Sequence, residues 1–464
     1  MSEILKIVEA VKSGKSSARK EVEKALKSAK DNEKLHAFLE ILENEALRRA
    51  DEIDAKIARG EKVGRLAGVP YAAKDNFLTK VGHTTAAAQI LENFKSPIDA
   101  TAIERLDNED AIMIGKTNLD AFAHGGSTEN SGFGVTHNAA DFERVAGGSS
   151  GGSAVAVAAG IVPFAAGSDT GGSIREPASF NGVVGFKPTY GTISRYGVVA
   201  MASSTDVLGP FTKTVTDAEI LMEIMAGQDN KDGTVHDDFY KTETDSPKKL
   251  KIGLIKEFLG DGVDEDVKNR TLEFAQKMRD QGHEIEEVDL PMAKYAVAIY
   301  YIVVPAELSS NLARHDGIRY GLRTKEAKNL DEVYTLTRKD GFVPENKRRI
   351  MIGSYVLSSG FFDAYYLQAQ KARTLLIQEF NDLFKKYDFL IGPVAPTPAW
   401  KIGTINNDPI KNYLADIMTI PPSLAGLPAI SLPNGDSKTG LPIGVQIIGQ
   451  QKSDAKLLAL AKSM

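Results

Sequence analysis

The sequence predicts an α/β protein built as one large domain. Apolar runs typical of strands alternate with helical patterns, as in the strand, helix and strand expected at 251–255, 267–281 and 284–288. A sizeable core is available, because 42% of the 464 residues are hydrophobic and 25% are charged. The length would suggest about three domains. No repeat or linker divides the chain, however, so we expect a single domain over 1–464.

The N-terminal segment, 1–63, predicts a helical layer. It is rich in Lys and Glu, and its charges are typical of a solvated face. Apolar residues recur in it at helical spacing; they are Ile4, Ile7, Val8, Val11, Leu35, Phe38, Leu39 and Leu42. We expect two or three surface helices.

Strand patterns begin after this layer. Residues 66–74 predict a strand with a turn, and the strand ends on a lysine, Lys74. A helix at 101–108 and a short strand at 111–115 follow, as expected of a layered α/β fold. A further helix is expected at 217–226.

The middle of the chain is rich in glycine. Between Gly125 and Gly209 lie 17 of the 41 glycines, and no lysine occurs from Thr117 to Phe186. The glycines alternate with Ala and Val runs that favour burial, so this region is neither a charged surface nor a flexible linker. Glycine permits tight turns and close approach of the backbone to another group. The most apolar stretch, 154–167, is too short to span a bilayer.

The second half of the chain continues the alternation of predicted strands and helices. Polar residues at 227–249 predict a surface loop. The remainder of the α/β domain is expected over 250–464, with helices filling 293–386 and strands at 388–393, 429–432 and 443–448.

Composition and charge exclude several classes of protein. Without cysteine there is no disulfide framework, thiolate-bound metal, iron–sulfur cluster or Cys nucleophile. The seven histidines show no metal-ligand spacing, so we expect no metal site. A formal net charge of −6 argues against a generic nucleic-acid binder. The acidic start, Met1 to Ile4, differs from a secretory signal, and we expect a cytoplasmic protein with no membrane association.

Two glycine-serine motifs, at 147–153 and 167–175, indicate where the chemistry lies. Each alone could be a loop that uses small residues for turns. A phosphate-binding loop is excluded because the Lys-Ser/Thr ending is missing. The spacing around Ser149 also matches the nucleophile elbow of α/β-hydrolases. That elbow needs an apolar strand before it, and the charged segment 141–146 disfavours this interpretation.

Together, Lys74, Ser149 in the first motif and Ser173 in the second resemble the amidase signature family. The similarity continues through 182–189 and, at lower density, over nearly the whole chain. It implies the amidase-signature fold, a mixed central β-sheet sandwiched between layers of α-helices, with a catalytic core at 66–215. It also implies a Ser-Ser-Lys triad that hydrolyses amides, with Ser173 as nucleophile, Ser149 as bridging serine and Lys74 as base.

The chemistry of an amide agrees with this resemblance. A serine hydroxyl is a poor nucleophile unless a base accepts its proton, so Lys74 must be neutral when it acts. Lowering a lysine pKa from about 10.4 to roughly 7 to 8 by burial disfavours its cation by about 3 to 4 kcal/mol. An oxyanion hole is expected from the backbone N–H groups of Thr170, Gly171, Gly172 and Ser173.

Within the family, the chain is most similar to the subunits that release ammonia from glutamine in tRNA-dependent amidotransferases. The similar segments are 127–131, 194–197, 348–351, 362–366 and 413–416. In those subunits a Tyr, an Arg and an Asp hold the α-amino and α-carboxylate groups of glutamine, and Tyr300, Arg349 and Asp416 match them. Tyr301 is the alternative tyrosine, and a structural ion pair is the alternative role for Arg349 and Asp416.

The resemblance also implies partners. It predicts a heterotrimer with subunits B and C, in which the partner subunit uses ATP and Mg²⁺, binds most of the mischarged tRNA and receives the ammonia. This chain itself is expected to need no cofactor. The alternatives are a stand-alone amidase of the same family acting on another carboxamide, and a non-enzymatic assembly protein that keeps the fold.

Three positions depart from the family pattern. Glu176 stands where Gln is common, Asn181 where Cys is frequent, and His124 where an apolar residue is usual. None of them belongs to the expected triad.

Overall fold

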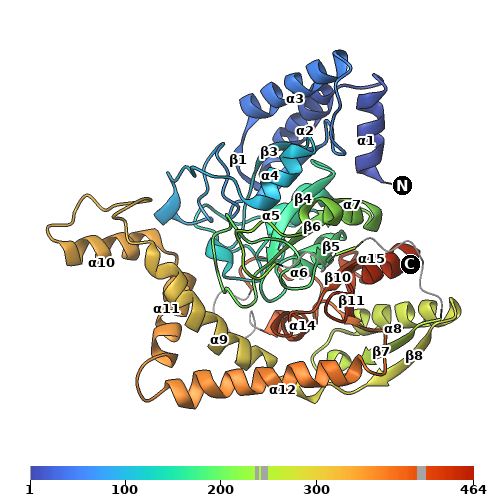
Figure 1. The fold of residues 1–464 in the computed structure, drawn as a ribbon. Helices are drawn as coiled ribbons and strands as arrows, with labels where there is room; N and C mark the ends of the chain where they lie inside the picture. The colour runs from blue at the N-terminus through green and yellow to red at the C-terminus, as the bar shows by residue number, and fades with distance from the viewer. Residues whose placement is uncertain (1, 236–239, 242–248, 405–413) are drawn as a thin grey trace.

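A single mixed β-sheet organises the computed structural model, which describes residues 2–235, 240–241, 249–404 and 414–464. The strands are β1 Phe38–Ile41, β2 Pro70–Lys74, β3 Ile112–Thr117, β4 Phe164–Asp169, β5 Val184–Lys187, β6 Val207–Thr212, β7 Lys251–Ile255, β8 Glu284–Val288, β9 Phe389–Pro393, β10 Ala429–Asp436 and β11 Pro442–Gly449. They follow the order β1-β3-β2-β4-β6-β5-β10-β11-β9-β7-β8 (Figure 1). Strand β2 runs parallel to β3 and β4, whereas β4 and β6 are antiparallel. The predicted α/β fold with a mixed sheet between helices is confirmed.

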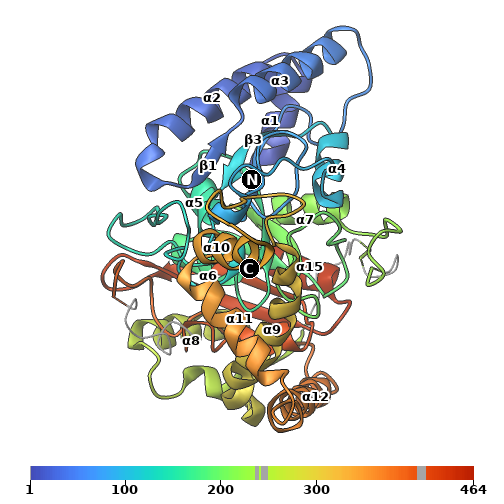
Figure 2. The same cartoon turned by 90° about the vertical axis from the view of Figure 1, so that its left-hand side faces the viewer.

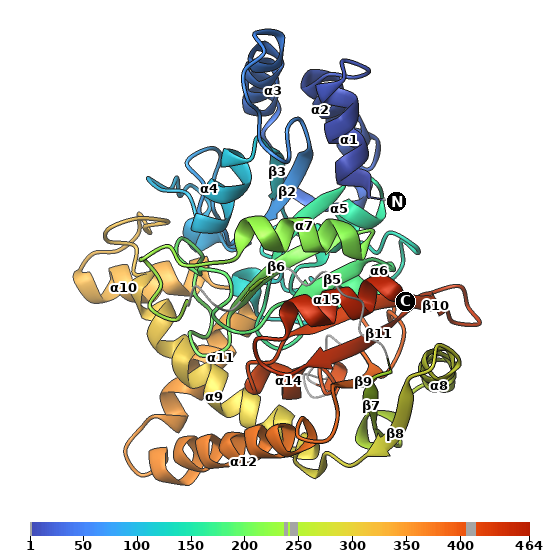
Figure 3. The ribbon, with the colours of Figure 1, turned by 45° about the vertical axis from the view of Figure 1, so that its right-hand side comes forward.

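Helices cover both faces of this sheet. They are α1 Glu3–Lys12, α2 Ala18–Asp31, α3 Glu43–Ala58, α4 Thr101–Asn108, α5 Gly151–Ala158, α6 Arg175–Asn181, α7 Val215–Met225, α8 Glu265–Asp280, α9 Ala296–Asn311, α10 Leu330–Gly341, α11 Pro344–Val356, α12 Gln368–Leu383, α14 Ile420–Leu424 and α15 Asp454–Ser463. Figure 3 shows α7 and α15 side by side across one face of the sheet. Helices α1 to α3 lie at the β1 end, and α12 lies at the opposite end (Figure 1).

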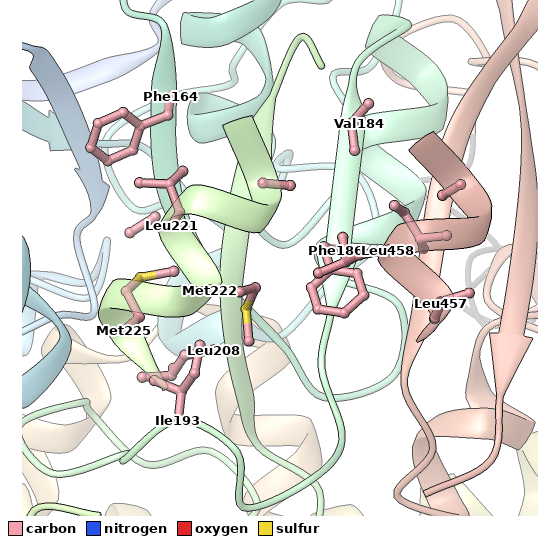
Figure 4. Packing of buried hydrophobic residues seen from close by; sticks show 14 of the residues in the cluster. Phe164, Val184, Phe186, Ile193, Leu208, Leu221, Met222, Met225, Leu457 and Leu458 are labelled. Carbon is pink, nitrogen blue, oxygen red and sulfur yellow. The ribbon is translucent and has the colours of Figure 1, made fainter. Parts of the chain in front are cut away.

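Alternate residues of β4 pack on opposite faces of the sheet, because successive side chains in a strand point to opposite sides. Phe164 and Ala166 join the hydrophobic cluster beneath α7 and α15, whereas Ala165 joins the cluster that contains Ala154 of α5. Figure 4 shows the first cluster, with Leu221 of α7 near Phe164. Strand β4 is therefore buried on both faces, which explains why its small residues run without polar alternation.

Helices α9, α11 and α12 form a separate outer layer (Figure 2). Helix α9 is the middle of a 24-residue helical segment, Pro291–Arg314, whose most apolar part has mean hydropathy 1.3. By length and composition alone this run could cross a membrane, a feature that was not predicted from the sequence. Half of its most apolar part is buried within the protein, however, against α11 and α12. Core helices satisfy the same criterion.

Helices α9 and α11 approach closely because Gly353 faces Pro305. A Cβ built on Gly353 would lie 1.9 Å from the carbonyl oxygen of Pro305, which is backbone and cannot move aside alone. Glycine at this position lets α11 pack directly on α9. This contact also sets how far from α9 the residues one turn earlier on α11 lie.

We expect Gly353→Ala to lower the free energy of unfolding by about 1 to 3 kcal/mol, because the added methyl group overpacks this contact. Urea unfolding measures the change. The neighbouring exposed Ser354 provides the control, since Ser354→Ala adds no atom at the interface and should change stability by less than about 0.5 kcal/mol. Equal stability of the two variants would contradict the tight contact.

One predicted element is wrong. Leu35, Phe38, Leu39 and Leu42 were expected on a helix, but Phe38–Ile41 forms β1, antiparallel to β3. Strand β3 would otherwise lie at the edge of the sheet, and it offers this segment a pairing partner. Hydrogen bonds between the two strands outweigh a helical spacing that only four residues support. The layer at 1–63 therefore contains α1, α2 and α3 and one strand.

The loop predicted at 227–249 lies partly outside the described residues. Its described start, 227–235, packs on the core through two acidic side chains. Asp229 accepts hydrogen bonds from Thr101 Oγ1 at 2.6 Å and from Ser194, and Asp232 pairs with Arg195 Nε at 2.8 Å.

Candidate active site

Lys74 ends β2, the third strand from the β1 edge of the sheet, and its side chain is fully buried. Its Nζ lies 2.8 Å from Ser149 Oγ, 2.8 Å from Ser150 Oγ and 2.9 Å from Ser168 Oγ. Strand pairing explains part of this cage. Residue Ala73 pairs with Ala166 in parallel register, which brings the end of β2 beside Ser168 near the end of β4. The two predicted residues Lys74 and Ser149 are thus in direct contact.

The hydrogen bonds around Lys74 leave two hydroxyls, those of Ser149 and Ser168, that can donate to it. Ser150 Oγ donates its own proton to the carbonyl oxygen of Ser168 at 3.0 Å, so it accepts from Lys74. Ser168 Oγ also accepts from Asn76 Nδ2 at 3.0 Å. A neutral amine has two N–H donors and one lone pair. With one donor used on Ser150, the second N–H and the lone pair face the hydroxyls of Ser149 and Ser168.

Burial lowers the pKa of Lys74 to about 7, although the buried carboxylates Asp120, Asp169 and Asp206 raise it in part. Near neutral pH a large fraction of Lys74 is therefore uncharged. Such a lysine can act as a base, as amide hydrolysis by a serine requires.

Ser173 lies in the turn between β4 and α6, beside the first motif. Its carbonyl oxygen accepts a hydrogen bond from the N–H of Ser150 at 3.3 Å, so the two glycine-serine segments are adjacent. In the described part of the chain, the backbone N–H groups of Gly171, Gly172 and Ser173 have no acceptor. Thr170 is held through its hydroxyl, which donates to Asp206 Oδ1 at 2.8 Å. This turn presents unpaired donors, as an oxyanion site needs.

A buried ion pair anchors the turn that contains Ser173. Arg175 and Asp169 are both fully buried, and Arg175 Nε lies 3.1 Å from Asp169 Oδ2. Arg175 also donates to the carbonyl oxygen of Thr419 at 2.9 Å, to Ser423 Oγ at 2.7 Å and to Gln446 Oε1 at 3.2 Å. The turn is therefore tied to α14 and β11, elements far away in the sequence.

The two glycines before Ser173 leave room for predicted substrate-binding residues. A Cβ built on Gly171 would lie 2.8 Å from Tyr300 Cζ, and one built on Gly172 would lie 2.9 Å from Asp416 Oδ1. Any side chain at either glycine would collide with these groups. Tyr300, from α9, and Asp416, beside α14, therefore sit directly against the turn.

Arg349 on α11 is buried and held by two neighbours. Its Nε donates to Glu345 Oε1 at 2.8 Å, and its guanidinium lies 5.0 Å from the centre of the Tyr301 ring. Of the two tyrosines considered from the sequence, Tyr301 lies beneath Arg349 and Tyr300 faces Gly171. The planar guanidinium of an arginine is suited to bind a carboxylate by donating paired hydrogen bonds to it.

Asp416 is a buried acid with an unsatisfied oxygen. Its Oδ1 has no hydrogen-bond partner among the described residues. Burial and the charge of Asp169 raise the pKa of Asp416 to about 8, against the lowering effect of Arg349. A cation bound beside it would stabilise the carboxylate and lower this pKa again.

Sequence reasoning missed several parts of the site. The cage residues Ser150 and Ser168 could have been found only by recognising β4 as the parallel neighbour of β2. Glu176, one of the departures from the family pattern, accepts the N–H of Gly148 at 3.0 Å and so braces the residue before Ser149. Among the described residues, no three His, Asp or Glu side chains gather as a metal ion would require.

A model of the amidase family matches residues 21–458. The chain belongs to the amidase family. Two bacterial relatives are named as the A subunit of glutamyl-tRNA(Gln) amidotransferase. The one from Geobacillus thermodenitrificans is 52% identical over 92% of this chain and 89% of its own length, and the one from Agathobacter rectalis is 50% identical over 98% and 92%.

Solved structures show how far this amidase resembles other members. The crystal structure of the amidotransferase A subunit from Thermotoga maritima has a TM-score of 0.80 at 42% identity, covering 96% of this chain and 90% of that one. A bacterial aryl acylamidase has a TM-score of 0.86 at only 26% identity, covering 100% and 95%. The backbone alone therefore does not distinguish substrates within the family, and the pocket residues must do so.

Proposed function

We propose that this amidase is the glutaminase subunit of a tRNA-dependent amidotransferase. It hydrolyses the side-chain amide of glutamine and supplies ammonia for converting Glu-tRNA(Gln) to Gln-tRNA(Gln), Asp-tRNA(Asn) to Asn-tRNA(Asn), or both. One observation supports this most: the buried Asp416 and the Tyr300 ring lie against the glycines that precede Ser173. An aryl or aliphatic amide would have no use for a buried carboxyl group at that place.

The proposed reaction uses two serines and one lysine. Ser173 Oγ attacks the amide carbon of glutamine while its proton passes to Ser149, and Ser149 gives its own proton to the lone pair of Lys74. The N–H groups from Thr170 to Ser173 bind the oxyanion. Lys74 then returns the proton through Ser149 to the leaving ammonia, and a glutamyl ester on Ser173 remains. Water hydrolyses this ester to glutamate by the same route.

Substrate recognition in this proposal uses charge complementarity. Arg349 binds the α-carboxylate, Asp416 the α-ammonium, and Tyr300 packs beside the bound amino acid. Ammonia then passes to a partner subunit, which uses ATP and Mg²⁺ to amidate the mischarged tRNA, in a heterotrimer with subunits B and C. The relatives' names support this assembly.

The test is purification from the source organism followed by assay. The proposal predicts that the chain arrives with two partners, and that the complex releases ammonia from glutamine and amidates a mischarged tRNA in the presence of ATP. A protein that purifies alone and hydrolyses simple amides but not glutamine would contradict it.

Arg349→Ala should lower kcat/KM for glutamine by about 100- to 1000-fold, mainly through KM, because a desolvated charge contact of about 3 to 4 kcal/mol is lost. Hydrolysis of propionamide, which has no carboxylate, should change little. Arg348 is the matched control: it pairs with the same Glu345 but is exposed, so Arg348→Ala should leave KM unchanged. Equal losses for both substrates would indicate a structural ion pair only.

A further inference from the structure

His124 is a buried imidazole with an unused donor. Its side chain is fully buried, and Nε2 has no hydrogen-bond partner among the described residues. A buried polar atom without a partner is costly, so native proteins usually satisfy it with protein, water or ligand. This atom therefore needs an explanation that packing does not give.

Asn346 on α11 determines which nitrogen of His124 has the proton. Asn346 Nδ2 donates to the carbonyl oxygen of Ala121 at 2.9 Å, and since that carbonyl can only accept, the amide orientation is fixed. The same Nδ2 lies 2.6 Å from His124 Nδ1. Nδ1 must then accept, which puts the ring proton on Nε2. His124 thus presents an N–H group. Burial, with the nearby charge of Arg349, lowers the pKa of His124 and keeps the ring neutral.

The segment around His124 lies between the nucleophile region and the helix that bears Arg349. On one side, a Cβ built on Gly148, the residue before Ser149, would lie 2.5 Å from the N–H nitrogen of Ser127. On the other side, His124 contacts Asn346, which shares a face of α11 with Arg349 three residues later.

The backbone before His124 is held in an uncommon conformation. Phe122 and Ala123 both have left-handed backbone angles, with φ of 54° and 63°. Such conformations in non-glycine residues persist where the surroundings enforce them, and they concentrate at binding sites. Here the amide of Asn130 holds the segment by donating to the carbonyl oxygen of His124 at 3.1 Å. The backbone that bears the imidazole is therefore held by a specific side-chain contact.

We infer that His124 is a substrate-binding residue whose Nε2–H donates to the α-carboxylate of the amino-acid substrate, beside Arg349. This inference rests on the proposed function. A carboxylate accepts up to about four hydrogen bonds, whereas Arg349 already spends its Nε on Glu345. A second, uncharged donor completes the carboxylate site without adding a second buried positive charge. Asn346 is the positioning residue that fixes the tautomer.

The test measures binding by calorimetry in a Ser173→Ala background, using the complex as purified. His124→Met should raise the dissociation constant of glutamine about 10- to 100-fold, the value of one hydrogen bond to a charged group. Binding of glutamine methyl ester, which has no free carboxylate, should change less than about 2-fold. His124→Gln retains a donor and should restore part of the glutamine affinity.

His315 is the matched control, since it is also buried and packs on the same Phe122 ring at 5.0 Å. His315→Met should leave glutamine binding unchanged. With Ser173 present, His124→Met should raise KM and change kcat by less than about 3-fold. If His124→Met binds glutamine as the parent does, the inference is wrong while the proposed function stands. If the parent binds no glutamine, the proposed function itself fails.

Discussion

Replacing Ser173 with alanine should abolish glutamine hydrolysis, with a fall in kcat of at least about 10⁴-fold. Removing the nucleophile of a serine hydrolase leaves only the contribution of the oxyanion donors and of substrate binding. A coupled assay for ammonia released by the purified complex measures this loss. Acid quenching and peptide mass spectrometry of the parent enzyme should also find a glutamyl ester on the peptide that contains Ser173.

Ser153 is the matched control for Ser173, because it is a buried serine in the first glycine-serine motif. Its hydroxyl donates to the carbonyl oxygen of Ala166 at 3.1 Å and does not reach Lys74. Ser153→Ala should keep kcat within about 3-fold of the parent and lower the unfolding free energy by about 1 kcal/mol. If Ser173→Ala kept the activity of Ser153→Ala, the assignment of the nucleophile would be wrong.

Removing the base should have a comparable effect. Lys74→Ala should lower kcat by at least about 10³-fold, because neither serine can then lose its proton. Lys74→Arg should be equally inactive, since arginine stays charged at every working pH. In the parent enzyme the neutral form is active. With the pKa of Lys74 at about 7, kcat/KM for propionamide, which has no ammonium group to bind Asp416, should rise as the pH increases through 7 and fall below it.

Lys187 makes the pH experiment decisive. It is also fully buried, and burial, with the charge of Arg175, lowers its pKa to about 7. It donates to backbone oxygens of Pro188 and Leu427, away from the two serines. Lys187→Met should lower stability but leave the midpoint of the kcat/KM profile in place. A midpoint that moves in Lys187→Met, or a flat parent profile from about pH 5.5 to 8.5, would refute the neutral Lys74.

The three candidate catalytic residues were more predictable from the sequence than the residues that surround them. Lys74 stood out because a lysine ended a strand of small apolar residues, and burial of that strand places its amine in a dry cage. Ser149 and Ser173 lay in motifs whose spacing has few alternative uses. The contacts of Lys74 and Asn76 with Ser168 depend on the register between β2 and β4, which no local pattern reveals.

The glycine-rich centre was recognised as a whole, but its elements were not assigned. Helices α5 and α6 and strands β4, β5 and β6 all lie there. They lack the usual alternation because both faces of the sheet are covered, so periodicity gives no signal. His124 was noted only as a departure from the family pattern, because the sequence does not show whether the second nitrogen of an imidazole has a partner.

The anchoring of Arg175 has a consequence for biosynthesis. Besides Asp169, this buried guanidinium is satisfied by Thr419, Ser423 and Gln446, which are synthesised at least 244 residues after it. Until then the loop bearing the nucleophile would hold a buried cation with too few partners, which is unfavourable. A nascent or prematurely terminated chain should therefore lack a formed oxyanion turn and consume no glutamine in the cell.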